Sequence, residues 1–392
     1  MPRRAKGPRL YLKERAGREA VWIIRDGQYE RSTGCAHASL GEAERQLATY
    51  IAEKWTPEQG AGIRSRRDPA QVGVVEVLAL YTMERAPALK ADPASTAGFI
   101  AHLNAWWGEK MIADVKRSTC KAYVAHRIMQ PRSSFKDPSK APRVSEQTAA
   151  RELDILSAAI GYWHGEDTLT TRPVVWKPEK PDSPRDALTR DQAAALLKAA
   201  RGYRWNGKRW LRLRDSGASN RAHMKRFILL GLYTGSRSKV ITTLVREESP
   251  TNPYQDLDRG MVYRRGKGQQ ETANKRRPLV KLPPRLLAHM RRWDRLDRDL
   301  SETPAAIIHH GGNPVGKVRR GFAACVADAG LPEEVTPHWL RHTAATWLME
   351  RGADIWDACG YLGMTPKTLV DHYGHHRPDH QSGAIRALSG NR

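Results

Sequence analysis

The sequence predicts a mainly α-helical protein with small β-sheets, of the α+β class. Apolar residues recur at helical spacing from about residue 71 to 165, and again over most of the chain after residue 187. Short runs rich in Tyr, Val, Trp and Ile precede the first helical region, and one hairpin-like stretch near 260–283 interrupts the second. A chain of 392 residues with 40% hydrophobic residues can form two or three domains, each with its own core.

The segment 1–60 predicts a three-stranded sheet followed by one helix. In "RLYLKERAGREAVWIIRDGQYERSTGC", the strand-like runs are separated by Ala16-Gly17 and Asp26-Gly27, and Asp-Gly is a frequent hairpin dipeptide. A helix is expected from near Ser39. We expect an independent module whose basic strands enter a DNA groove. Alternatively, these charges are solvated edge-strand residues that prevent aggregation. The candidate DNA contacts are Arg9, Lys13, Arg25 and Arg31.

The segment 71–177 predicts a helical bundle, because residues 95–115 and 145–163 both place apolar residues at i, i+3, i+4 and i+7. Arg151, in the second of these helices, is a further candidate DNA contact. The basic loop "MQPRSSFKDPSKAPR" between them could follow a phosphate backbone. Proline and charge then mark 178–186 as a linker, which leaves 187–380 as the third domain and 381–392 as a tail.

The charge balance points to a polyanionic partner. The chain has 66 Lys and Arg against 42 Asp and Glu, so its formal net charge is +24, and the excess is spread along the whole length. Folded domains with basic faces are typical of proteins that bind nucleic acid.

Cysteine usage and hydropathy bear on the compartment. The cysteines form no CxxC pair, which indicates a reducing compartment rather than a disulfide framework or a zinc ribbon. The N-terminus has no apolar h-region and no run approaches 18 apolar residues, so neither a signal peptide nor a membrane span is expected. The four cysteines are Cys35, Cys120, Cys325 and Cys359.

Two basic residues stand at expected junctions of the third domain. In "FILLGLYTGSRSKVITTL" an apolar helix breaks at Thr234-Gly235, and Arg237 then begins a new helical turn at a buried junction. An arginine that caps carbonyl groups is an equally good interpretation. Lys275 lies in a basic turn before the strand expected at 279–282, where a solvated hairpin tip is the alternative.

The stretch "TPHWLRHTAATW" places His338 and Arg341 three residues apart, so that on a helix they share one face and converge on one point. Pro337 suits a first helical turn, and the N-terminus of a helix favours an anion. We expect His342 to point elsewhere and to serve the fold.

A short helix is expected at 366–373. Thr365 is a good N-cap, Pro366 suits the first position, and Gly374 follows the last turn, which carries Tyr373. A tyrosine at the end of a short, glycine-terminated helix can be mobile and exposed.

These motifs resemble those of the tyrosine recombinase, or phage integrase, family. The similarity lies in "TGSR" (234–237), "HWLRHTAAT" (338–346) and "LGMTPKTLVDHYGH" (362–375), with Lys275 placed before its strand as the family's hairpin lysine is. It covers about 185–380, while 71–180 is similar to the family's core-binding domain, a SAM-like helical domain, only in its helical pattern. The resemblance implies an N-terminal arm-type module, a core-binding domain and a mainly α catalytic domain with a β-hairpin.

The resemblance also implies a mechanism. Tyr373 would attack a DNA phosphodiester and form a 3′-phosphotyrosyl link, which stores the bond energy. Arg237 and Arg341 would bind the nonbridging oxygens and stabilise the transition state. His338 would take or share the tyrosine proton, and Lys275 would protonate the leaving 5′-oxygen. No metal and no cofactor is implied.

Two positions depart from the family pattern. Met364 stands where the family has His or Trp, and a thioether is a poor hydrogen-bond donor. Val240 stands where an acidic residue is common. His372 or His375 could replace the missing donor, and we expect activity to be retained, with a catalytically weakened DNA-binding protein as the alternative.

The implied protein is a site-specific integrase in the bacterial cytoplasm, at the nucleoid. Its implied partners are double-stranded DNA attachment sites, three further copies in a homotetramer on a Holliday junction, and host or element-encoded DNA-bending or excision factors. Residues after Tyr373 would contact a neighbouring protomer. The rivals are an architectural DNA-binding factor, a type IB topoisomerase that relaxes DNA, and a metal-dependent nuclease. The metal ligands of the last would be Asp371, His372, His375, His376 and His380.

Overall fold

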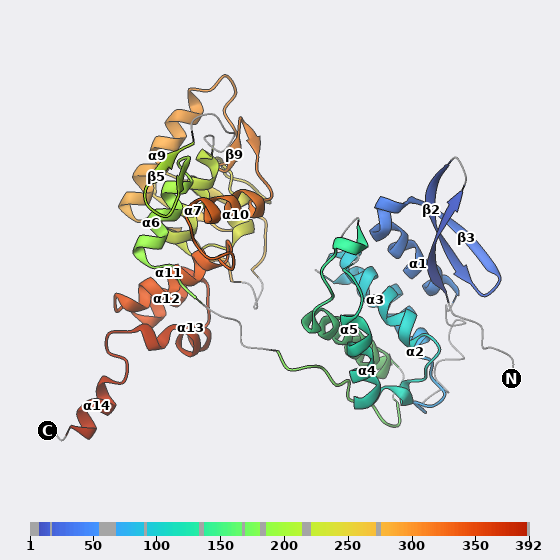
Figure 1. Cartoon of the computed structure of the whole chain (residues 1–392). Helices are drawn as coiled ribbons and strands as arrows, with labels where there is room; N and C mark the ends of the chain where they lie inside the picture. The colour runs from blue at the N-terminus through green and yellow to red at the C-terminus, as the bar shows by residue number, and fades with distance from the viewer. Residues whose placement is uncertain are drawn as a thin grey trace. The chain divides into compact units, whose positions relative to one another are not determined.

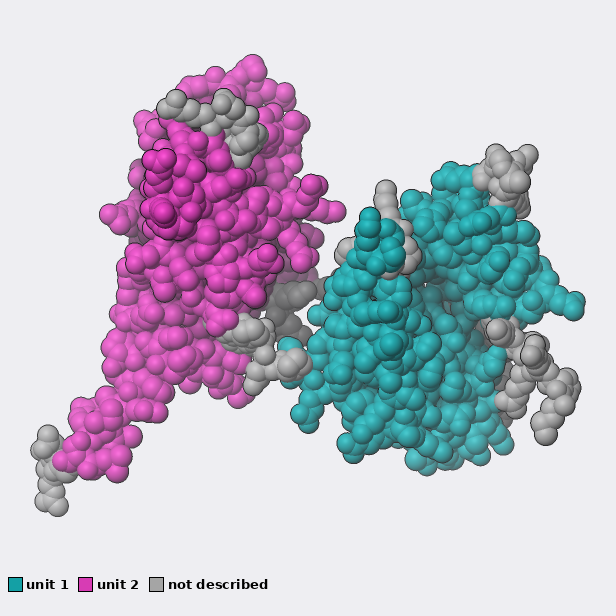
Figure 2. Space-filling model, in the orientation of Figure 1, with its two compact units in different colours: residues 1–182 teal, residues 183–392 magenta. Residues whose placement is uncertain are grey.

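The computed structural model divides the chain into two compact units, residues 1–182 and 183–392 (Figure 2). It is mainly helical with small sheets, which confirms the predicted fold class (Figure 1). The structure describes residues 8–15, 18–54, 68–89, 92–132, 137–166, 169–180, 186–213, 221–271 and 276–389.

Unit 1 begins with an antiparallel three-stranded sheet in the order β1-β2-β3. Asp26 pairs with Tyr29, so the second hairpin closes through Gly27 and Gln28, and Gly27 adopts a φ of 61° that favours glycine. A short 3-10 turn, His37–Ser39, leads into helix α1, as the sequence predicted. The elements are β1 (Arg9–Arg15), β2 (Arg18–Asp26), β3 (Tyr29–Ala36) and α1 (Leu40–Lys54).

The sheet does not form the independent module that the sequence suggested. Helix α1 contacts all three strands on one side and helices α2 and α3 on the other (Figure 1). Ile24 of the sheet and Leu47 and Ile51 of α1 share one buried cluster with Val75 and Ala101 of the helices. The physical reason is that α1 has apolar residues on two faces, so its burial requires the helical bundle as well as the sheet.

The helical part of unit 1 is built around α5. Trp107, Tyr123, Leu156 and Trp163 are fully buried in its core. Arg127 donates from Nε and Nη2 to the Glu152 carboxylate, at 2.8 and 2.7 Å, and this buried ion pair joins α4 to α5. The elements are α2 (Val74–Leu80), a π-helical turn (Tyr81–Arg85), 3-10 turns (Ala86–Ala88, Ile112–Asp114 and Pro138–Lys140), α3 (Pro93–Trp107), α4 (Arg117–Ile128) and α5 (Glu146–Glu166).

In its described residues, unit 2 has a helical core with three small sheets. The expected hairpin region contributes β7 and β8 to a sheet of order β6-β7-β8. Its elements are α6 (Arg190–Ala199), β4 (Tyr203–Trp205), β5 (Trp210–Arg212), α7 (Ala222–Thr234), α8 (Ser238–Thr242), β6 (Tyr254–Asp256), β7 (Met261–Tyr263), β8 (Val280–Lys281), α9 (Pro284–Arg298), β9 (His309–His310), β10 (Asn313–Pro314), α10 (Arg319–Asp328), α11 (Trp339–Glu350), α12 (Ile355–Leu362), α13 (Pro366–Tyr373), a 3-10 turn (Gly374–His376) and α14 (Ser382–Leu388).

Two hairpins in unit 2 were not predicted, although both carry a sequence signal. The β4–β5 hairpin closes through residues 206–209, which begin with Asn206-Gly207, and Gly207 has a φ of 90°. The β9–β10 hairpin turns at Gly311-Gly312, with φ values of 54° and 85°. Asn-Gly and Gly-Gly are both hairpin dipeptides, but strands of two or three residues give too short a pattern to stand out.

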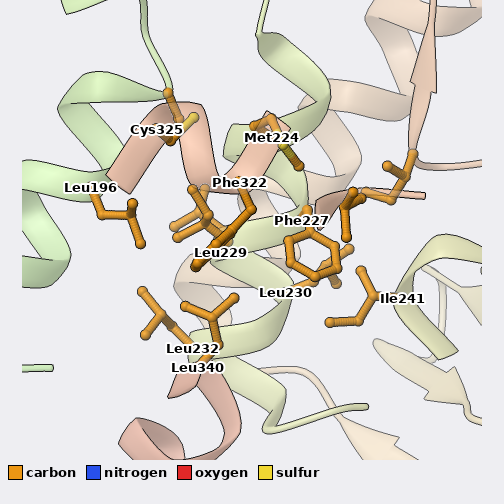
Figure 3. Close-up of a cluster of buried hydrophobic side chains, with 14 of the residues drawn as sticks. Leu196, Met224, Phe227, Leu229, Leu230, Leu232, Ile241, Phe322, Cys325 and Leu340 are labelled. Atoms are coloured by element: carbon orange, nitrogen blue, oxygen red, sulfur yellow. The ribbon is translucent and has the colours of Figure 1, made fainter. Parts of the chain in front are cut away.

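Helix α7 lies at the centre of unit 2 and contributes Met224, Phe227, Ile228, Leu229, Leu230 and Leu232 to a buried hydrophobic cluster, part of which Figure 3 shows. Leu340, at the start of α11, packs on α7 at Gly231, where a Cβ would lie 2.6 Å from Leu340 Cδ1. The glycine therefore allows α11 to approach α7 closely. This contact brings the start of α11, with its histidines and arginine, next to the C-terminal end of α7.

Candidate active site

A cavity of about 240 Å³ in unit 2 brings together most of the residues that the motifs singled out. Four of the five predicted catalytic residues line it, together with the residue at the family's His or Trp position. The fifth, Lys275, lies outside the described residues, so its role stays a prediction. The lining consists of Arg237, Arg276, His338, Arg341, His342, Gly363, Met364, Thr365, Thr368 and Tyr373.

Arg237 reaches the cavity from the junction between α7 and α8, as the sequence predicted. Gly235 ends α7 in the left-handed conformation, with a φ of 60°, and Arg237 is the N-cap residue of α8. Its Nη1 donates to the Arg276 carbonyl oxygen at 3.1 Å. Burial, and then the nearby charge of Arg277, lower the pKa of Arg237. The guanidinium is therefore half-desolvated and favours an anion as its partner.

Arg341 is buried at the bottom of the same cavity, with 5% of its surface exposed. Its Nη1 donates to the carbonyl oxygens of Gly235 and Leu362, at 2.6 and 2.8 Å, and its Nη2 donates to Gly363 at 3.5 Å. Burial, and then Arg237, lower the pKa of Arg341 to about 10. Its hydrogen-bond acceptors are neutral, so a phosphate entering the cavity would be its first full countercharge.

Arg264 is a second buried arginine next to this site, and the sequence did not reveal it. Its Nε donates to Ser236 Oγ at 2.9 Å, its Nη1 to the Tyr361 carbonyl at 2.7 Å, and its Nη2 to the Thr234 carbonyl. Burial, and then Arg341, lower its pKa to about 9. Arg264 thus ties the "TGSR" loop to the end of α12. Only its partners identify this role, because it lies in an ordinary basic run after β7.

The position where the family has an acidic residue is Val240, which is buried in α8 with 6% exposure. It cannot pair with an arginine. Among the described residues, no carboxylate forms an ion pair with Arg237, Arg264 or Arg341. Backbone carbonyl oxygens accept hydrogen bonds from these three arginines instead.

The expectation that His342 points away from the site is wrong. Its Nδ1 lies 2.5 Å from the Tyr373 hydroxyl oxygen, and its ring packs edge to face on the His338 ring, with 4.5 Å between centroids. His338 is the N-cap residue of α11, and His342 is four residues further. Residues four apart lie on one helix face, so the spacing alone could have placed both histidines in the site.

The expectation that Tyr373 is exposed is also wrong. The end of α13 lies where the sequence predicted, with Thr365 capping its start, but only 1% of Tyr373 is exposed. The ring packs in a cluster with Ala345, Met349 and Leu369. Gly374 has a right-handed helical conformation, and the chain continues directly into a 3-10 turn.

Met364 lines the cavity, and its thioether supplies no strong hydrogen-bond donor there. His372 and His375, the residues expected to compensate, instead line a neighbouring cavity beside α6 and α11. Arg276 lines the active-site cavity and had not been singled out. Its position next to Lys275 was the available signal.

Three of the four candidate DNA contacts on the sheet share one face. Arg9 is paired with Arg25 in the strand register. Lys13 lies four residues after Arg9 on β1 and therefore on the same face. Lys13 Nζ donates to Glu30 at 2.7 Å and Arg25 Nε donates to it at 2.9 Å. The fourth candidate faces the other way: Arg31 pairs with the buried Ile24 and reaches Glu53 of α1 at 3.5 Å. Arg151 is exposed on α5.

Two further features concern the rival functions. Within the described ranges, no three His, Cys, Asp or Glu side chains are grouped in a way that could hold a metal ion. The side chains at 371–380 that were considered as ligands of a metal-dependent nuclease are among the residues described. In the same ranges, no helix combines the length and apolar character needed to cross a membrane.

Comparison with known proteins identifies a consistent group of relatives. The model of the phage integrase family matches residues 187–380. The tyrosine recombinase XerD of Lacticaseibacillus casei is 21% identical over 344 residues, which cover 87% of this chain and 89% of the relative. The tyrosine recombinase XerC of Chlamydia trachomatis serovar D is 25% identical over 236 residues, 59% of this chain and 67% of the relative.

Solved structures share the fold. The integrase of transposon Tn1549, bound to transposon right-end DNA, matches with a TM-score of 0.60 at 16% identity, over 81% of this chain and 100% of that one. A lambda integrase dimer bound to a core site matches with a TM-score of 0.52 at 17% identity, over 96% of this chain and 97% of that one. A lambda integrase tetramer on a Holliday junction gives 0.51 at 16% identity, over 91% and 96%.

Proposed function

This chain belongs to the tyrosine recombinase, or phage integrase, family, and from that premise we propose that it is the site-specific integrase of a mobile element. It is an enzyme that breaks and rejoins DNA. The observation that carries the proposal is the arrangement of one cavity. Tyr373 lines it together with Arg237 and Arg341, whose acceptors among the described residues are carbonyl oxygens.

The proposed reaction begins with the Tyr373 oxygen, which attacks the DNA phosphorus while the bond to the 5′-oxygen breaks. Arg237 and Arg341 bind the nonbridging oxygens, whose negative charge grows in the transition state. Lys275 gives a proton to the leaving 5′-oxygen, and a histidine of the site, His338 by the family resemblance, takes or shares the proton of Tyr373. Attack by another 5′-hydroxyl on the phosphotyrosyl bond reverses these steps, so rejoining needs no ATP and no metal.

The domains take separate parts in this proposal. Residues 1–60 would bind arm-type DNA sites through the sheet face that carries Arg9, Lys13 and Arg25. Residues 71–177 would bind the core site, with Arg151 among the contacts, and 187–380 would perform the chemistry. The linker 178–186 would cross the duplex. Because Arg31 faces α1 and Glu53, we assign it a weaker part in DNA binding.

The proposed assembly is a homotetramer on two duplexes, joined through a Holliday junction. Support comes from lambda integrase, which was solved as a dimer on a core site and as a tetramer on a Holliday junction. The Tn1549 integrase, bound to transposon end DNA, supports a mobile-element origin. DNA-bending or excision factors would assist, and the reaction would take place in the bacterial cytoplasm, at the nucleoid.

Two rivals from the sequence remain testable alternatives. An architectural factor would bind the same DNA but form no covalent link. A type IB topoisomerase would form the link but relax DNA rather than exchange strands. The basic face of the N-terminal sheet favours exchange, because it suits recognition of defined flanking sites.

The test combines junction sequencing with covalent trapping. Sequencing the junctions between the element ends and host DNA defines the core site, and a nicked duplex of that sequence then serves as a suicide substrate. We expect an adduct that resists SDS and forms in EDTA, and no adduct with Tyr373→Phe. Tyr361→Phe is the matched control, because Tyr361 is half-buried and its hydroxyl donates to the Tyr233 carbonyl at 3.0 Å. An adduct that persists in Tyr373→Phe would refute this nucleophile.

A further inference from the structure

We propose that His342, rather than His338, takes the hydroxyl proton of Tyr373 when the tyrosine attacks the DNA phosphate. This inference rests on the proposed function, since it assumes that Tyr373 is the nucleophile. It assigns a catalytic part to a residue that the sequence motifs had left to the fold.

The distance between the two groups is the first support. His342 Nδ1 lies 2.5 Å from the Tyr373 hydroxyl oxygen, within hydrogen-bond reach of the proton that must leave. His342 is 7% exposed and Tyr373 1% exposed. Water therefore has little access to this proton, and a side chain must accept it.

The second support is that the surrounding structure fixes both side chains. Tyr373 packs with Ala345 and Met349 of α11, the helix that carries His342. The next residue, Thr343, accepts a hydrogen bond from the Leu188 backbone N–H at 2.9 Å, which anchors this turn of α11. The hydrogen-bonded pair is thus held by the core on one side, while the cavity opens on the other.

The charges around the pair favour proton transfer in this direction. Arg341 lies close enough to Tyr373 for the two to interact electrostatically, so its positive charge stabilises a developing phenolate. His342 must be neutral at the start, with its proton on Nε2, so that Nδ1 can accept. His338, which packs on the His342 ring, is then available to contact a phosphate oxygen.

The proton balance closes over both half-reactions. During cleavage the O–H proton of Tyr373 moves to His342 Nδ1 as the new P–O bond forms, and the leaving 5′-oxygen takes its proton from Lys275. During rejoining the phosphotyrosyl bond breaks, His342 returns its proton to the tyrosine oxygen, and the attacking 5′-hydroxyl gives its proton back to the lysine. No other reactant is needed.

The test replaces His342 by Asn and by Ala. An Asn Oδ1 stands near the place of Nδ1 and accepts a hydrogen bond, but it cannot hold the proton, so His342→Asn separates proton acceptance from positioning. The substrate is a duplex whose 3′-phosphate at the mapped cleavage position carries a p-nitrophenyl ester. Since p-nitrophenolate leaves without a proton, its release rate reports the attack by Tyr373 alone. His338→Asn is compared directly, and His289→Asn on α9 is the matched control.

We expect both His342→Asn and His342→Ala to slow release by about 100-fold or more, in line with the usual contribution of a general base. His338→Asn should slow it less, and His289→Asn should match the wild type. A His342→Asn rate within threefold of the wild type would overturn the proposal and leave His342 a positioning role. If Tyr373→Phe released p-nitrophenolate as fast as the wild type, the proposed nucleophile would fail instead, and the two failures are thereby distinguished.

A measurement without DNA keeps the proposal testable if the His342 variants fold poorly. In the full chain labelled with ¹⁵N-histidine, NMR should show His342 as the Nε2–H tautomer. Its Nδ1 should be a hydrogen-bond acceptor, with a shift that changes in Tyr373→Phe. A proton on Nδ1 of neutral His342 would overturn the proposal, because that nitrogen could not accept another.

Discussion

Arg264 and Arg341 are two buried arginines that each join the same two helix ends. Arg341 donates to Gly235 after α7 and to Leu362 at the end of α12, while Arg264 donates to Thr234 and to Tyr361 one residue earlier in each segment. Each helix end exposes carbonyl groups that its own backbone cannot satisfy. The two guanidinium groups satisfy them and so set the position of the loop that carries Arg237.

Replacement of Arg264 should therefore weaken both the fold and the reaction. Arg264→Met leaves two carbonyls without this donor and removes one of the two donors to Ser236 Oγ, and we expect the free energy of unfolding to fall by about 3 kcal/mol. DNA cleavage should slow at least tenfold, because the Arg237 loop loses a support. Arg265→Met is the matched control, since Arg265 donates only to the Gln269 carbonyl at 3.2 Å among its described contacts. Urea denaturation and single-turnover cleavage measure the two effects, and equal behaviour of the two variants would contradict this role.

Met364→His should accelerate cleavage. The side chain at this position lines the cavity, and an imidazole N–H would add a hydrogen bond to the phosphate that the thioether cannot supply. A net gain of about 1 kcal/mol in the transition state corresponds to roughly a fivefold faster single-turnover rate. Met364→Leu, which adds no donor, should leave the rate nearly unchanged. A slower Met364→His enzyme would show that the cavity does not tolerate an imidazole there.

Lys275→Ala should slow cleavage by about 10²–10⁴-fold, as expected for the loss of a general acid. A substrate with sulfur in place of the bridging 5′-oxygen should restore the rate, because a thiolate leaves without protonation. Lys267 lies in the same segment between β7 and β8, and it pairs with Glu248 at 2.9 Å. If the loss and the rescue follow Lys267→Ala instead, the general acid is Lys267.

Removal of residues 382–392 should impair synapsis more than cleavage. Helix α14 has no buried residue, and Ile385 and Leu388 are 59% and 89% exposed. Apolar side chains on an otherwise unpacked helix suit contact with a neighbouring protomer. We expect cleavage of a single suicide duplex within twofold of the wild type, and a loss of four-protomer complexes in gel-shift assays. Unaltered recombination would refute a role for the tail between protomers.

Local sequence signals were enough to predict much of unit 2. The left-handed Gly235 that ends α7 and the Thr365 cap that begins α13 act within a few residues, so they can be interpreted without the fold. Each of the four predicted residues that line the cavity stands next to such a signal or within a motif, which is why the sequence could single it out. They are Arg237, His338, Arg341 and Tyr373. Their individual roles remain proposals.

Contacts between distant segments explain what the sequence did not reveal. Arg264 acts through a carbonyl 97 residues away, and His342 meets a tyrosine 31 residues further along the chain. The burial of Tyr373 likewise depends on α11 and α12, although the boundaries of its own helix were predicted. The packing of α1 on α3 could not be inferred either, because its apolar pattern does not state which partner covers which face.

The half-buried carboxylate of Glu44 gives a last prediction, in unit 1. Glu44 belongs to α1 and lies against α3 at Gly98, where a Cβ would be only 2.9 Å from its Oε2. Burial raises the pKa of Glu44 to about 6, while the nearby charge of Arg127 acts in the opposite direction. The folded state therefore holds this proton up to about pH 6, whereas the unfolded chain releases it near the ordinary value of 4.5. As pH rises through this window, Glu44 lowers the free energy of unfolding. Above the window, the charged carboxylate destabilises the folded state by a constant amount.

Glu44→Gln removes that charge and keeps the shape of the side chain, so it should stabilise the protein at pH 8. A shift from 4.5 to about 6 corresponds to a gain of about 2 kcal/mol in the free energy of unfolding. At pH 4.5 the gain should vanish, because the folded wild type is already protonated. His102, whose pKa burial lowers to about 4, has the opposite pH dependence, but it is present in both proteins and cancels from their difference. Glu42→Gln, at an exposed position on the same helix, is the control, and urea denaturation at the two pH values decides the outcome. Equal stability of Glu44→Gln and the wild type at pH 8 would mean that Glu44 is solvated where α1 meets α3.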